Sequence, residues 1–117
     1  MDYLRLLRPK DAQQLAINRE EQKKVQGTTR EIDFKPVVKL HIPFTYCMWL
    51  LTELDDEGMA FGLCQIHVAE LGYVWLPELL DIDVKGIKVV QDLAFLPKMT
   101  LREYVDAARR NGGLLLP

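Results

Sequence analysis

The 117-residue sequence has no basic residue between Lys39 and Lys85, an interval that holds eight acidic residues. It has only two cysteines, Cys47 and Cys64, and no Cys-x-x-Cys pair, so nothing favours a redox motif or a zinc ribbon. No stretch approaches the roughly 18 apolar residues that a membrane span needs, and the first residues lack the apolar run of a signal peptide. We therefore expect a cytoplasmic protein with reduced thiols and no membrane contact.

Motifs for catalysis or cofactor binding are also missing: there is no Gly-x-Ser-x-Gly, P-loop or dinucleotide fingerprint. Structural zinc sites usually come as two tight ligand pairs on turns. Here only Cys64 and His67 are close in sequence, within the wider set of His41, Cys47, Cys64 and His67. Residues three apart on a strand point to opposite faces, which argues against a Cys64–His67 hydrogen bond. We predict no catalytic residue, cofactor or metal site, and keep a small metal- or thiol-dependent enzyme as a third hypothesis.

The basic residues gather near the N-terminus. Residues 1–30 carry seven basic and four acidic side chains, a net charge of +3, whereas residues 31–117 carry eight basic and thirteen acidic ones, a net charge of −5. Nucleic-acid binding needs clustered Lys and Arg that displace counterions. We therefore disfavour DNA contact through the body of the protein and leave open a contact through Arg19, Lys23 and Lys24.

A helix is predicted near each end of the chain. Pro9 suits a first helical turn, and glycine and threonine after Gln26 favour a stop there. This N-terminal helix has a thin apolar stripe, so we expect it to pack loosely on the body. Thr100 and Glu103 form a capping-box pattern, and apolar residues follow at helical spacing as far as Asn111.

The segment between these helices reads as a succession of strands. Strands are predicted at 36–42, 46–54, 59–68, 73–76 and 87–95, with one helical turn at 77–82. This order predicts an α+β fold: an antiparallel sheet of about four to five strands with an N-terminal helix and a C-terminal helix packed on it. We expect a single domain over 1–117, with a basic N-terminal helix in 1–30 and an α+β body in 36–111.

The acidic turn at 55–58 predicts a hairpin between the two apolar strands beside it. When the strand ends are aligned, Trp49 lies opposite Cys64. Cys47 is then a diagonal neighbour of Cys64, too distant for an unstrained disulfide. Both faces of this hairpin are apolar, so it is either covered on both sides by its own chain or covered on one side by a partner.

Several blocks of the sequence resemble a bacterial family, the domain of unknown function 2958. In order they are Trp49–Glu53, Phe61–Cys64, Glu70–Val74, Asp92–Phe95 with Pro97, and the helix at 101–108. The resemblance covers most of residues 36–110, although the 55–58 turn is shorter than usual and Trp75 replaces a small polar residue. It implies a plasmid, phage or other mobile element, often beside replication, partition or anti-restriction genes, and supplies no catalytic residue.

The leading hypothesis is a non-catalytic protein-binding module of a mobile genetic element in the bacterial cytoplasm. Its sharpest form is an anti-defence inhibitor, anti-CRISPR or anti-restriction, because an acidic face with aromatic anchors suits a basic host protein such as a nuclease or CRISPR effector. The alternative is a plasmid-maintenance accessory protein that contacts DNA through its basic helix, and a homodimer is compatible with either. The predicted partner-binding residues are Trp49, Glu53, Asp55, Asp56, Glu57, Trp75, Glu78, Asp81 and Asp83.

Overall fold

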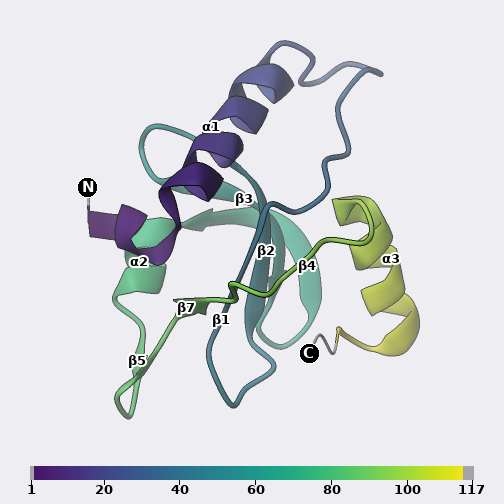
Figure 1. Cartoon of the computed structure of the whole chain (residues 1–117). Coiled ribbons are helices and arrows are strands. Elements are labelled where there is room, and N and C mark those ends of the chain that lie inside the picture. The colour runs from purple at the N-terminus through teal and green to yellow at the C-terminus, as the bar shows by residue number, and fades with distance from the viewer. Residues whose placement is uncertain (1, 115–117) are drawn as a thin grey trace.

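The apolar middle of the chain forms the predicted hairpin in the computed structural model, which describes residues 2–114. Its arms are β2 (Met48–Leu54) and β3 (Met59–Gln65), and β4 (Ala69–Trp75) returns antiparallel along β3. On the other side, β1 (Val38–His41) and β7 (Val90–Gln91) complete a five-stranded antiparallel sheet in the order β4-β3-β2-β1-β7. The α+β architecture is thus confirmed (Figure 1).

Small elements fill the connection from β4 to β7. Helix α2 (Leu76–Leu80) begins directly after β4 and has Pro77 in its first turn, as predicted. Strands β5 (Asp83–Val84) and β6 (Ile87–Lys88) form a separate two-stranded sheet. The single strand predicted at 87–95 is therefore wrong, because β6 pairs back on β5 while β7 pairs with β1. No helix within residues 2–114 is long and apolar enough to cross a membrane.

The chain itself covers both faces of the central hairpin (Figure 1). Trp49 and Leu51 face a core that includes side chains of the 3-10 helix η1 (Asp2–Leu6), helix α1 (Pro9–Lys23) and α2. On the opposite face, Leu50 and Leu63 pack against α3 (Leu101–Asn111). At its centre the hairpin is therefore covered on both faces by its own chain, which was the first of the two alternatives.

A β-bulge at Thr52 changes the hairpin register close to the acidic turn. Trp49 pairs with Cys64 as predicted, but beyond Thr52 the partners shift by one residue and Leu54 pairs with Ala60. An extra residue in one strand reverses the alternation of its side chains beyond that point. Leu54 consequently joins the same core as Trp49, rather than lying on the opposite face.

Helix α1 is shorter and more firmly packed than predicted. It ends at Lys23 and lies against β2. Leu15 is fully buried, and the polar residues Asn18 and Gln22 are buried as well. The prediction of loose packing was wrong because it counted only apolar positions, whereas α1 docks through polar side chains too.

Helix α3 has the predicted boundaries. The Thr100 hydroxyl accepts from the Glu103 N–H at 3.4 Å, and the Glu103 carboxylate accepts from the Thr100 N–H at 2.9 Å. Gly112, in the left-handed region at φ 74°, ends the helix. The chain then docks on the body through buried Leu114, whose N–H donates to Gln65 at 2.7 Å, and residues 115–117 lie outside the described residues.

Candidate protein-interaction surface

Two of the residues predicted to bind a partner lie inside the molecule. Trp49 is 2% exposed and belongs to the core beneath η1, α1 and α2. Glu53 is 4% exposed, and its carboxylate accepts from the Arg19 guanidinium at 3.2 Å. The prediction is wrong for both residues, because the N-terminal part of the chain covers them.

The acidic turn at the hairpin end is rigidly built. The Asp55 carboxylate accepts from the backbone N–H groups of Glu57 and Met59, both at 2.9 Å. Gly58 takes a left-handed conformation, with φ at 88°, that closes the turn. Asp55 is half-buried and its carboxylate stabilises the turn, while the side chains of Asp56 and Glu57 are exposed.

Trp75 lies beside this turn. Its indole Nε1–H donates to the Glu57 carbonyl at 3.0 Å, and it pairs across the strands with Met59. The Leu76 N–H donates to the Gly58 carbonyl at 2.9 Å, which fixes the start of α2 on the same turn. Trp75 remains 44% exposed, so its indole ring is held at the Nε1 edge and presents the rest of its surface to solvent.

The exposed apolar surface continues from Trp75 along β3 and β4. Tyr73 is 60% exposed and its ring packs against Phe61, with centroids 5.0 Å apart and a 59° angle between the planes. Helix α3 covers the other end of this face, where Leu63 and Leu71 lie. Together with the turn, these strands form what we call the acidic–aromatic surface: Asp56, Glu57, Met59, Tyr73 and Trp75.

The other three predicted acids lie farther along the chain. Glu78 is exposed on α2, Asp81 is exposed directly after α2, and Asp83 belongs to the separate β5–β6 hairpin. The Asp83 carboxylate accepts from the Gly86 N–H at 2.6 Å and lies 3.8 Å from the Lys88 ammonium. Because its charge is already paired, Asp83 adds little to an acidic surface.

The opposite end of the sheet carries exposed apolar residues that were not among the predicted partner-binding residues. Phe44, at the β1–β2 connection, is 95% exposed and has a left-handed backbone, with φ at 68°. This conformation is uncommon outside glycine. We call the group the apolar tip: Phe44, Tyr46, Ile66 and Val68. Phe44 lies between two predicted strands, where an apolar residue has no core to enter, whereas Tyr46, Ile66 and Val68 were predicted to lie within strands that in fact begin later or end earlier.

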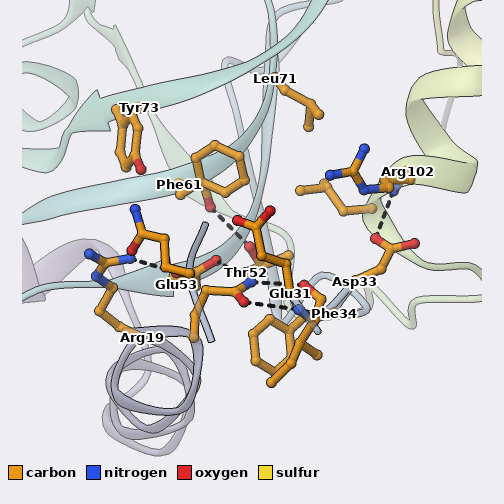
Figure 2. A pocket seen from close by; sticks show the side chains of 14 residues that line it. Arg19, Glu31, Asp33, Phe34, Thr52, Glu53, Phe61, Leu71, Tyr73 and Arg102 are labelled. Atoms are coloured by element: carbon orange, nitrogen blue, oxygen red, sulfur yellow. Dashed lines mark hydrogen bonds and ion pairs between the residues drawn. The ribbon is translucent and has the colours of Figure 1, made fainter. Parts of the chain in front are cut away.

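A cleft of about 100 Å³ lies between α1, the segment 26–34, the sheet and α3 (Figure 2). Figure 2 shows Phe61 and Tyr73 on one wall and Arg19 and Arg102 at opposite ends. Gln22 ties the outer segment to α1 through its amide, which donates to the Ile32 carbonyl at 2.8 Å and accepts from the Ile32 N–H at 2.9 Å. This cleft is smaller than usual small-molecule sites.

The residues of the DNA-binding alternative do not form an open basic surface. Arg19 is directed to Glu53 inside the molecule. Lys23 lies 3.0 Å from Glu20, and Lys24 lies 3.3 Å from Glu21. Each of these cations therefore has a carboxylate beside it, which reduces its attraction for phosphate.

The thiols and histidines do not converge either. Within residues 2–114, no group of three or more His, Cys, Asp or Glu side chains could hold a metal ion. Burial, helped by the Glu70 carboxylate, raises the pKa of the Cys64 thiol to about 11. Burial and the Lys39 charge lower the pKa of His41, against an opposing effect of Asp92. A thiol with a raised pKa is a poor nucleophile near neutral pH.

Comparison with known proteins identifies one family. The model of a family described as "Protein of unknown function (DUF2958)" matches residues 6–115, which include α1 and extend beyond the blocks that carry the sequence resemblance. No curated protein and no solved structure matches the chain.

Proposed function

Because this chain belongs to the DUF2958 family of proteins of unknown function, we propose its function from its surface: it is a non-catalytic module that binds a basic partner protein. The observation that carries this proposal is the acidic–aromatic surface. Trp75 is held at one edge by its bond to the Glu57 carbonyl and exposes the rest of its ring beside acidic groups. An exposed aromatic surface rimmed by polar groups is typical of protein interfaces.

The chemistry of this surface selects a cationic partner. An Arg or Lys side chain can stack on the ring of Trp75 or Tyr73 and gains from the quadrupole of the ring. The carboxylates of Asp56 and Glu57 lie in the adjacent turn and attract the same charge. Since the turn and the Trp75 edge are already fixed by hydrogen bonds, little ordering is needed on binding.

The finer form of the proposal is an anti-defence inhibitor encoded by a mobile genetic element. Enzymes that process DNA carry basic surfaces for phosphate, and a protein that occupies such a surface competes with DNA. A CRISPR effector or a restriction nuclease of the bacterial host is the partner that this chemistry fits. The DNA-binding alternative loses support, because Arg19, Lys23 and Lys24 are each beside a carboxylate.

The test uses purified restriction nucleases and CRISPR effectors, with binding and DNA cleavage as readouts. Glu57→Lys and Trp75→Ala should each weaken binding and inhibition by about tenfold or more. Asp106→Lys makes the same charge change as Glu57→Lys on an exposed position of α3 and should leave both readouts unchanged.

Two results would count against the proposal. If no nuclease or effector is bound or inhibited, the anti-defence role is wrong. If Phe44→Ser abolishes binding while Glu57→Lys and Trp75→Ala do not, the partner docks on the apolar tip, and the basic-partner form of the proposal is wrong.

A further inference from the structure

The outer edge of β4 is an open end of the sheet. In the order β4-β3-β2-β1-β7, no strand within residues 2–114 pairs with the outer side of β4. The opposite edge, β7, is only two residues long, and the side-chain Oε1 of its Gln91 accepts from the Arg8 N–H at 2.9 Å. Strand β4 runs for seven residues without Lys or Pro, the residues that usually protect an edge.

The register shows which backbone groups of β4 face outward. The Leu76 N–H donates to the Gly58 carbonyl, and bonding residues alternate along an antiparallel ladder. In the β3–β4 register this directs the backbone of Glu70, Gly72 and Val74 toward β3. The N–H and C=O groups of the alternate residues therefore face away from the sheet, and these residues are Ala69, Leu71, Tyr73 and Trp75.

Gly72 lies at the centre of this edge, and the fold of the monomer does not require a glycine at this position. Its φ is outside the left-handed region that the other positive-φ glycines occupy. A Cβ added at Gly72 would meet nothing within 4 Å. Glycine weakens a strand, and in a strand it often marks the close approach of another backbone. Gly62, on the neighbouring strand, differs because a Cβ there would overlap the Leu50 carbonyl.

We propose that β4 pairs antiparallel with β4 of a second copy, with Gly72 on the two-fold axis. This register uses the whole strand, because Gly72 is its midpoint. Leu71 then bonds to Tyr73 of the second copy through the outward backbone groups, and the small Ala69 lies opposite the large Trp75. Glu70 lies opposite Val74, so no two carboxylates face each other.

The occupant follows from this self-complementarity. A two-fold axis through the middle of one strand pairs each residue with its mirror position. On β4 these pairs are Ala69 with Trp75, Glu70 with Val74, Leu71 with Tyr73, and Gly72 with itself. The two copies would extend one sheet across the axis and bring their acidic–aromatic surfaces onto the same face. The dimer does not depend on the proposed function, because it uses the strand edge rather than a basic partner.

Sedimentation equilibrium on the full chain tests the dimer directly. Wild type should show twice the monomer mass at protein concentrations in the micromolar range and above. Gly72→Lys and Gly72→Glu have open space within the monomer, but each places like charges opposite each other at the axis. Each variant alone should raise the dimer dissociation constant at least about fivefold.

Mixing the two charge variants makes the test specific to the axis. Gly72→Lys and Gly72→Glu together should form a heterodimer that is tighter than either homodimer, because opposite charges then meet at the axis. A monomeric wild type at all these concentrations would overturn the proposal. Equal dimerisation of wild type and both charge variants would overturn the Gly72 axis. Circular dichroism of each variant confirms that the monomer is folded.

Discussion

The guanidinium of Arg19 on α1 contacts the carboxylate of Glu53 on β2 at 3.2 Å, and both side chains are largely shielded from water. The amide of Gln22 lies 3.5 Å from the other oxygen of the same carboxylate. This contact joins a helix that was expected to be loose to a strand residue that was expected to be exposed. The ion pair explains both why α1 packs firmly and why Glu53 is buried, because each charge stabilises the other inside the molecule.

We expect Arg19→Ala to lower the free energy of unfolding by about 2 kcal/mol, because it leaves the buried Glu53 carboxylate without its cation. Urea denaturation at fixed protein concentration measures this loss. The exposed pair of Lys23 and Glu20 provides the control, and Lys23→Ala should cost less than about 0.5 kcal/mol. Equal effects of the two substitutions would show that the Arg19 pair is not specially buried.

The two glycines that face each other across β3 and β4 should respond oppositely to alanine. Gly62→Ala pushes a Cβ into the Leu50 carbonyl and should destabilise the fold by about 3 kcal/mol or more. Gly72→Ala enters open space and should be neutral or stabilise by up to about 1 kcal/mol. Thermal or urea unfolding compares them at one protein concentration. A large loss for Gly72→Ala would mean that the space beside β4 is occupied within the monomer.

Cys64 should react slowly with alkylating reagents. A pKa of about 11, against the ordinary 9.0, makes its thiolate on the order of 100-fold rarer at pH 8 than in the unfolded chain. Iodoacetamide labelling of a Cys47→Ser variant, followed by mass spectrometry with and without urea, measures the ratio. Labelling at the same rate in both conditions would contradict the buried position of this thiol.

The same shift predicts an alkaline loss of stability. The folded state keeps the Cys64 proton to a higher pH than the unfolded state, so this contribution is complete below pH 9.0 and is lost as the pH rises toward about 11. Cys64→Ser should therefore flatten the dependence of unfolding free energy on pH in that interval. An unchanged slope would assign the alkaline loss to other groups.

Gln65 should be the main attachment of the chain after α3. Its amide donates to the Leu114 carbonyl at 3.1 Å and accepts from the Leu114 N–H at 2.7 Å. Gln65→Met keeps the shape but leaves these buried groups unsatisfied, which should cost about 2 kcal/mol. Exposed Gln13→Met is the control and should be neutral within about 0.5 kcal/mol. Carboxypeptidase digestion should also proceed faster in Gln65→Met than in the control.

Local sequence signals predicted the elements that depend on neighbours in the chain. The capping box at Thr100 and the stop at Gly112 set α3, and the hairpin signals placed Trp49 opposite Cys64. These features are short-range, so the residues that create them lie close together in the sequence. The acidic turn and its exposed charges on Asp56 and Glu57 were predicted for the same reason.

The errors come from contacts between distant segments. Lys39 shows how such contacts arise: it is 4% exposed, and its ammonium lies 3.4 Å from the carboxylate of Asp92, which the β1–β7 pairing brings close. The bulge at Thr52 likewise has no local signal. Its carbonyl accepts from the buried Asn18 amide at 3.0 Å, so α1 supplies a bond that an adjacent strand would otherwise make. No periodicity within one segment reports such a partner.

The polar docking of α1 has a consequence for the order in which the molecule opens. Release of α1 exposes the buried Leu15 side chain, which water solvates poorly, but Asn18, Arg19, Gln22 and Glu53 find good hydrogen-bond partners in water. Detachment of α1 should therefore be an early subglobal opening, and its amide protons should exchange faster than those of β2 and β3. Such an opening would expose the cleft beside Phe61 to solvent while the sheet stays intact.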